Sequence, residues 1–171
     1  MKSLMNKSAK EIIFACSCLL LLIAIYLPYM TIIVEYNGKL NVREFAMFPS
    51  ITGFLMLLIS VGGVLMILGG HCKKVVFLGI GNAVIFMIRV LMDKSSAANF
   101  QHTIDMINQI ENIMLNGNKE SVVEWGYNSG YFFILMATIL LLLVGGWCFL
   151  DTEKKEEEEE IEAEELARKK A

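Results

Sequence analysis

The chain has 171 residues, of which 56% are hydrophobic, with a formal net charge of −3 and a mean hydropathy of +0.55. The core of a water-soluble protein does not need so large an apolar fraction, so the composition favours an integral membrane protein. The chain lacks a basic patch interleaved with aromatic residues, which argues against nucleic acid as a partner.

Four long apolar stretches predict four transmembrane helices. They cover residues 12–29, 51–70, 75–92 and 131–150. About 20 helical residues cross the hydrocarbon of a bilayer, and a helix satisfies its own backbone hydrogen bonds in lipid. None of the stretches alternates like a barrel strand. We therefore expect an all-α membrane protein: a four-transmembrane-helix bundle in residues 1–150, followed by an acidic tail in residues 151–171.

The first stretch follows three lysines and ends at Leu27-Pro28-Tyr29. A basic start is also typical of cleaved signal peptides, but these end at a small-residue cleavage site. The bulky residues that end this stretch favour a retained helix.

The dipeptide Asn37-Gly38 predicts a β-hairpin at residues 31–43, because it separates two β-rich runs. Both central residues of such a turn must adopt positive φ, which Asn and Gly tolerate. The apolar side chains expected to meet across the hairpin are Ile32, Val34 and Tyr36 opposite Leu40 and Val42. An isolated hairpin is marginally stable in water, so this one should rest on another apolar segment.

Glycines are concentrated in the second and third stretches. They are Gly53, Gly62, Gly63, Gly69, Gly70, Gly79 and Gly81. Small residues let helices approach closely in lipid, and only a short turn joins these two stretches. The simplest prediction is that the second and third helices pack on each other as an antiparallel pair, although the glycines also permit self-association of the protein.

Asn82 and Arg89 are the candidate intramembrane polar positions, seven residues apart and therefore on one face of the third helix. Arg89 lies near the outer end, where its side chain can reach the interface, and Asp93 follows as an i,i+4 partner. A local ion pair is the favoured interpretation. The alternatives are a polar path for a solute and a contact with the carboxylate of a substrate or partner.

Residues 96–115 predict an amphipathic helix in the second outer segment, since apolar residues recur there at helical spacing. The candidate partner-facing residues are Phe100, Ile104, Ile107, Ile110 and Met114. We expect the helix to lie over the outer mouth of the bundle and to form an extracytoplasmic cap with the hairpin. Insertion into the lipid interface and docking to a partner protein are the alternatives.

Aromatic residues flank the fourth stretch as in the belts of membrane proteins: Trp125, Tyr127 and Tyr131 precede it, and Trp147 lies near its inner end. The tail beyond carries a block of acidic residues at 156–160. Its composition suits a solvated helix that continues the fourth span, while repulsion within the block favours fraying. Docking to a basic surface and loose binding of divalent cations are the functional alternatives.

Basic residues predict the orientation, because Lys and Arg near helix ends are retained on the cytoplasmic side. They occur in the N-terminal segment, in the turn at residues 71–74 and at Lys154-Lys155. If four helices cross, all three segments fall on one side, so both termini are predicted cytoplasmic in a multi-pass plasma (inner) membrane protein. The four cysteines lie in inner helix halves or at the cytoplasmic face, which argues for reduced thiols. We predict no catalytic, cofactor or metal residues.

The layout of residues 12–150 resembles small, uncharacterised bacterial membrane proteins with four transmembrane helices. The matching features are Leu27-Pro28-Tyr29, the hairpin, Lys73-Lys74 and the segment Gly126-Tyr127-x-x-Gly130-Tyr131. The resemblance implies the four-helix layout and brings no functional residues with it.

Two functions remain open from the sequence. The favoured one is a non-catalytic accessory, assembly or sensing subunit that binds a membrane-protein partner through the outer cap or the tail. The alternative is a small transporter or channel with a polar path near Asn82 and Arg89. An enzyme is disfavoured, because the usual cluster of His, Asp, Glu or Cys at one membrane face is missing from the sequence pattern.

Overall fold

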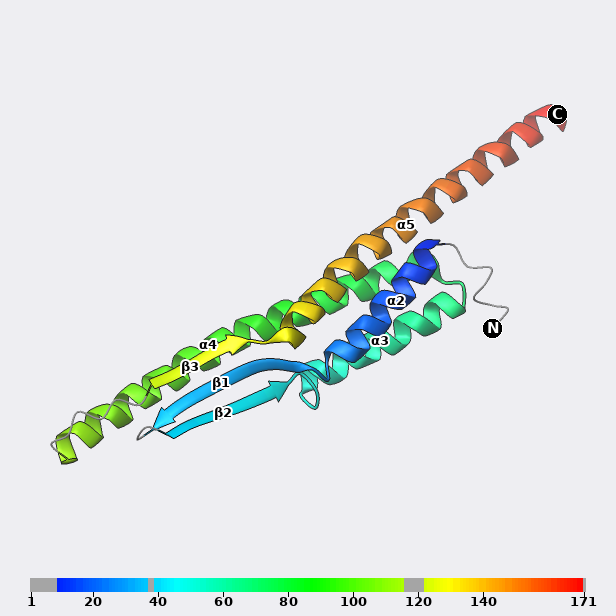
Figure 1. Ribbon diagram of the computed structural model, residues 1–171. Coiled ribbons are helices and arrows are strands. Elements are labelled where there is room, and N and C mark those ends of the chain that lie inside the picture. Colours follow the sequence, from blue (N-terminus) through cyan, green and yellow to red (C-terminus); the bar gives the residue numbers. More distant parts are fainter. Residues whose placement is uncertain (1–8, 37–38, 116–121, 171) are drawn as a thin grey trace.

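The computed structural model describes residues 9–36, 39–115 and 122–170. Its helices are α2 (Ala9–Ala24), α3 (Ile51–Leu68), α4 (Val75–Leu115) and α5 (Ser129–Lys170), with a 3-10 turn, η1 (Cys72–Lys74), before α4. Its strands are β1 (Pro28–Tyr36), β2 (Lys39–Ala46) and β3 (Val122–Tyr127). The molecule is elongated: the sheet and the second half of α4 extend from one end of the helix bundle, and α5 projects from the other (Figure 1).

Within the described residues, three helical segments are long and apolar enough to cross a membrane: Ile51–Leu68, Cys72–Thr103 and Ser129–Lys154. The first predicted span is shorter in the structure, because α2 has only 16 residues. It nevertheless belongs to the same bundle. Helices adjacent in the chain pack on one another, and α2 also packs on α5, so the four helices form a closed ring.

Local sequence explains where these helices begin and end. Pro28 disfavours helical backbone at the residue before it, and the chain leaves α2 shortly before this proline. Ser50 caps α3, since its Oγ accepts a hydrogen bond from the N–H of Gly53 at 3.1 Å. After α3 the chain turns at Gly70, whose φ of +78° is rarely adopted by other residues.

The closest helix contacts differ from the predicted pair of second and third helices. A Cβ added to Gly63 of α3 would lie 2.6 Å from Cys18 Sγ of α2, and one added to Gly79 of α4 would lie 2.9 Å from the Leu141 carbonyl oxygen of α5. A Cβ on Gly62, by contrast, would meet nothing within 4 Å. α3 and α4 are in contact, but the closest approaches at Gly63 and Gly79 are to α2 and α5 respectively. The predicted pair of α3 and α4 is therefore present, although Gly63 and Gly79 make their tightest contacts with α2 and α5.

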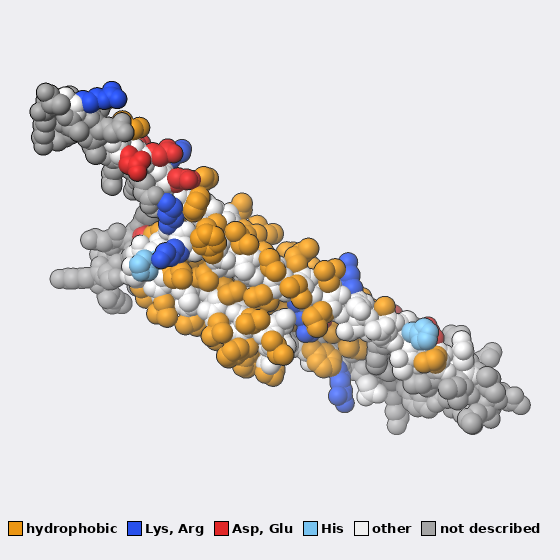
Figure 2. All heavy atoms as spheres, turned by 180° about the vertical axis from the view of Figure 1, so that it is seen from behind, with side chains coloured by type: hydrophobic (Ala, Val, Ile, Leu, Met, Phe, Trp, Pro, Cys, Tyr) orange, Lys and Arg blue, Asp and Glu red, His pale blue; other side chains and the backbone are white. Residues whose placement is uncertain are grey.

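The outward surface of the bundle is apolar, as a lipid-facing surface requires. Ile51, Phe77, Phe132 and Leu143, from three different helices, are among its most exposed side chains. Figure 2 shows hydrophobic side chains covering the middle of the molecule on one face, with charged side chains towards the ends. This distribution agrees with a protein that lies across a membrane.

The strands form one antiparallel sheet in the order β2-β1-β3. The predicted hairpin is present, with strands longer than expected, and Tyr36 pairs with Lys39 across the two-residue connection. The expected face was wrong in detail. A two-residue connection places Ile33 opposite Val42 and Glu35 opposite Leu40, so the residues predicted to meet lie on opposite faces.

β3 was not predicted, since its aromatic residues were interpreted only as a membrane belt. Its β-branched and aromatic composition, Val-Val-Glu-Trp, was the available signal. β3 pairs with β1 along its length, with Ile32 opposite Trp125. The hairpin therefore rests on a third strand as well as on a helix.

The predicted outer helix at residues 96–115 is not a separate element lying over the mouth of the bundle. It is the second half of α4, which runs on beyond the span beside the sheet (Figure 1). The sequence between Asp93 and Asn99 contains neither Gly nor Pro, so nothing in it breaks the helix. The tail is likewise continuous with a span, because α5 runs through the predicted boundary at residue 150 and ends at Lys170.

The end of the bundle opposite the sheet joins the three basic segments of the chain. Lys10 of α2 forms an ion pair with Asp151 of α5. The Cys72 thiol donates to Glu11 Oε1 at 2.6 Å, and Lys73 lies over the ring of Phe149. The N-terminal helix start, the α3–α4 turn and the start of the tail are thus held together at one end.

Candidate functional site

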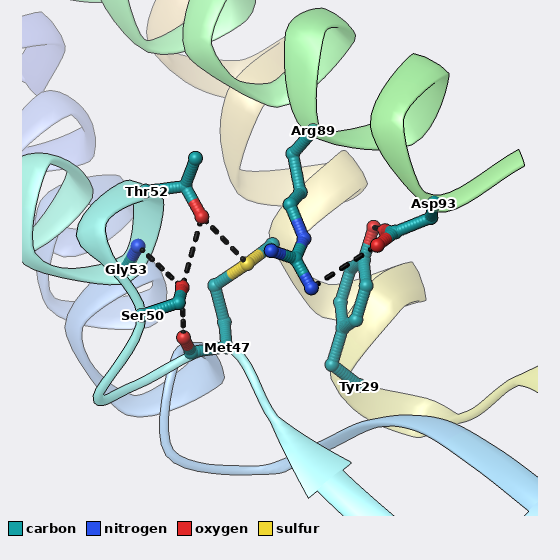
Figure 3. Close-up of polar contacts among 7 residues, drawn as sticks. All are labelled: Tyr29, Met47, Ser50, Thr52, Gly53, Arg89 and Asp93. Atoms are coloured by element: carbon teal, nitrogen blue, oxygen red, sulfur yellow. Dashed lines mark hydrogen bonds and ion pairs between the residues drawn. The ribbon is translucent and has the colours of Figure 1, made fainter. Parts of the chain in front are cut away.

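A buried polar contact lies where the sheet meets the bundle. Tyr29 Oη, at the start of β1, donates to Asp93 Oδ2 of α4 at 2.7 Å, and Arg89 Nη2 lies 3.0 Å from Asp93 Oδ1. Only 5% of the Asp93 side chain is exposed, compared with 25% for Arg89. Figure 3 shows Arg89 and Asp93 projecting from α4 towards the Tyr29 ring. We call these three residues the junction triad.

The predicted i,i+4 pair of Arg89 and Asp93 is therefore present, and sequence reasoning missed its third member. Tyr29 lies 64 positions away from Asp93 in the chain, so no local spacing could link them. The arrangement engages both carboxylate oxygens. A carboxylate held by a phenol and a guanidinium in this way ties α4 to the start of β1.

Aromatic rings surround the triad. Tyr127 of β3 stacks on Tyr131 of α5 with ring centroids 4.0 Å apart, and Tyr131 also contacts Phe86 of α4. Tyr29 meets Tyr127 edge to face at 5.7 Å. These contacts draw β1, β3, α4 and α5 together at one point, and the belt residues of the sequence serve here as packing between elements.

Burial raises the pKa of Tyr29 well above its usual value, and the hydrogen bond to the Asp93 carboxylate adds to this. The pKa of Tyr127 is also raised, first by burial and then by the negative charge of Asp93. Both phenols therefore stay protonated at neutral pH. Among the described residues, Tyr127 Oη and Arg89 Nε have no hydrogen-bond partner.

The connection from β2 to α3 has its own hydrogen bonds. The Thr52 hydroxyl donates to the Met47 sulfur at 3.5 Å (Figure 3). Ser50 Oγ donates to the Met47 carbonyl oxygen while it caps α3. The start of α3 is thus held to the residue that follows β2.

Asn82, the other predicted polar position, lies fully buried two turns deeper in the bundle. Its amide donates to Thr138 Oγ1 of α5 at 2.8 Å, and Thr138 donates in turn to the Ile134 carbonyl oxygen. Asn82 Oδ1 has no partner among the described residues. Phe86, buried against Tyr131, stands between Asn82 and Arg89, so the described contacts do not join the two polar positions.

The candidate outer-helix residues are only partly accounted for. Phe100, Ile104, Ile107, Ile110 and Met114 belong to α4, but their side chains lie outside the described residues. Which way they face therefore stays a prediction.

The exposed face of the sheet is a second candidate surface, on the side away from α4. Strand register places Ile33, Leu40 and Val42 on this face, whereas Ile32 and Trp125 face α4. We call these first three residues the sheet patch. Leu40 and Val42 are 62% and 52% exposed.

Groups for metal chemistry do not come together in the part of the chain that the structure describes, where no three His, Cys, Asp or Glu side chains converge. Cys16 is exposed on α2, whereas Cys18 and Cys148 are buried within the bundle. Comparison with known proteins finds no family model that matches the chain. The curated protein sequences contain no match either.

Proposed function

We propose that the protein is a non-catalytic accessory, assembly or sensing subunit of a plasma-membrane complex, and that it binds its partner through the sheet. The observation that carries this proposal is the exposure of Leu40 and Val42 on a strand that belongs to none of the three candidate spans. Exposed apolar side chains gathered on one face of a sheet are typical of protein interfaces.

The edge of β2 strengthens the proposal. Among the described strands, β2 pairs with β1 alone, so its outer edge still presents backbone N–H and C=O groups. An added strand would bond to that edge, and the sheet patch would select its side chains. Arg43 and Glu44 are exposed on the same strand, and charges at an edge discourage unspecific pairing. We therefore expect a specific partner.

We infer four spans with both termini cytoplasmic. α2 packs along α3 and α5, so the lipid that surrounds those helices also surrounds α2. The bundle end that holds Lys10, Lys73 and Lys74 carries the basic segments, which favours the cytoplasmic side for it. The sheet and the second half of α4 then form the extracytoplasmic cap.

Transport through a path near Asn82 and Arg89 is the weaker alternative. Asn82 Oδ1 offers a buried acceptor, but Arg89 is engaged with Asp93, and the buried Phe86 ring separates the two positions. Solute flux into vesicles that contain the purified protein, lost on Asn82→Leu, would support this alternative over partner binding.

The partner proposal is tested by isolating the protein from native membranes in nanodiscs, followed by intact-complex mass measurement and protein identification. We expect a second protein at fixed stoichiometry. The double variant Leu40→Ser, Val42→Ser should release it, whereas Asn41→Ser, Arg43→Ser, on the same strand but the other face, should retain it. A lone monomer or homo-oligomer from native membranes would overturn the proposal.

The orientation has its own test, in a background without the native cysteines. A cysteine at Glu44, exposed on the sheet, should react in intact cells with a thiol reagent that does not cross membranes. A cysteine at Glu153, exposed on α5, should react only after the cells are opened. The reverse pattern would place the termini outside.

A further inference from the structure

A pocket of about 190 Å³ lies between the sheet and α4, next to the junction triad. Its described lining consists of Met30, Ile32, Asp93, Ser96, Ala97 and Trp125. The small side chains of Ser96 and Ala97 face two bulky strands across it, which leaves the space open. The pocket uses the face of the sheet opposite the sheet patch, so it is separate from the proposed partner surface.

The pocket opens to the surface, because Ser96 and Trp125 in its lining are both exposed, and its volume suits a small ligand. An apolar cavity of roughly 150 Å³ stays dry and takes up a benzene-sized molecule. The space beside Ala97 therefore suits about one aromatic ring.

The chemistry of the lining narrows the class of ligand. Met30, Ile32, Ala97 and Trp125 provide apolar and polarisable walls, and both indole rings and thioethers contact aromatic rings favourably. Asp93 is the one charged residue in the described lining, and its oxygens are already engaged by Arg89 and Tyr29. The pair of Arg89 and Asp93 is neutral as a whole, so neither a cationic nor an anionic ligand gains from it.

Ser96 supplies the remaining polar feature. Ser96 is an exposed residue of α4 that lines the pocket, and a serine hydroxyl can donate or accept a hydrogen bond. We propose that this pocket binds a small uncharged aromatic molecule of about one ring, with a single hydrogen-bonding group directed towards Ser96.

The test uses 4-fluorophenol as the probe, with fluorine NMR of the purified full-length protein in nanodiscs. We expect saturable broadening of the probe signal with the wild-type protein. Ala97→Leu fills the pocket and should abolish the saturable part. Ala98→Leu makes the same change at the neighbouring exposed position and should leave it intact. This matched pair of variants distinguishes binding of the probe in the pocket from partition of the probe into lipid.

A second measurement does not depend on the folding of the Ala97 variant. The chain has two tryptophans, so Trp147→Phe leaves Trp125 in the pocket wall as the only one. Its fluorescence should change saturably with the probe, over the same concentration range as the NMR signal.

Three outcomes would overturn the proposal. The first is broadening that rises linearly and equally in all variants, together with no saturable change at Trp125, as expected for lipid partition or for a lipid chain that already fills the pocket. The second is binding of 4-fluorobenzoate that is stronger than binding of 4-fluorophenol. The third is binding of 4-fluorobenzylammonium that is stronger than binding of 4-fluorophenol. None of these results would bear on partner binding at the sheet patch.

Discussion

The helix bundle and the outer sheet are held together by different kinds of contact. In the bundle, helices meet at Gly63 and Gly79 with no room for another carbon atom. At the junction with the sheet, the decisive contacts are polar, from Tyr29 and Arg89 to Asp93. Lipid provides no hydrophobic drive between helices, so the bundle depends on close fit, whereas the junction depends on paired polar groups. Added volume should therefore damage the first region, and a lost partner the second.

The largest effect is expected from Asp93→Ala. It leaves a buried Tyr29 hydroxyl and the Arg89 charge without their partner, at a cost of about 3 kcal/mol in the free energy of unfolding. This cost is smaller than for a fully buried ion pair, because water reaches Arg89. Asp105→Ala, at an exposed position on the same helix, should change it by less than about 0.5 kcal/mol. Chemical unfolding in detergent measures both. Equal effects would mean that the triad does not hold the junction.

Gly79→Ala should be next, with a loss of about 2 kcal/mol, because its Cβ would strike the backbone of Leu141. Gly62→Ala adds the same methyl group where nothing lies within 4 Å, and the better helix propensity of alanine should leave stability unchanged or slightly higher. Thermal unfolding of the two variants in one detergent compares them directly. A bundle that tolerates both changes equally is not held by close fit at α4 and α5.

Asn82→Leu should cost about 1 kcal/mol or less, although Asn82 is fully buried. The variant loses the bond to Thr138, but it also removes a buried oxygen that has no partner among the described residues, and Thr138 keeps its bond to the Ile134 carbonyl. The same unfolding assay applies. A loss as large as that from Asp93→Ala would show that the bundle, like the junction, depends on its polar pair.

The smallest effect concerns pH. The folded-state pKa of Tyr29 is raised, by burial first and then by its bond to Asp93, so its contribution is fully present below the unfolded pKa of about 10. Above that pH the unfolded phenol ionises and the contribution falls. The stability difference between wild type and Tyr29→Phe should therefore be constant from pH 7 to 9 and shrink towards pH 11. A difference that stays constant to pH 11 would contradict this account.

Sequence alone was sufficient for features that depend on neighbours in the chain. The apolar stretches, the Asn37-Gly38 hairpin and the i,i+4 pair of Arg89 and Asp93 could all be predicted, because each follows from local spacing and the backbone preferences of a few residues. The second half of α4 was predicted as a helix for the same reason. Its continuity with the span follows from the absence of Gly and Pro between Asp93 and Asn99.

Only the tertiary structure decided which distant segments meet. Tyr29 bonds to Asp93, and β3 pairs with β1. Gly63 makes its closest contact with α2, and Gly79 makes its closest contact with α5. The pocket beside Ala97 arises in the same way, from two strands and a helix that are far apart in the chain. Periodicity marks which face of an element is apolar, but it does not say which other face will cover it. Which faces pack together depends on how well complete surfaces fit, and the sequence of a single helix or strand does not determine this fit.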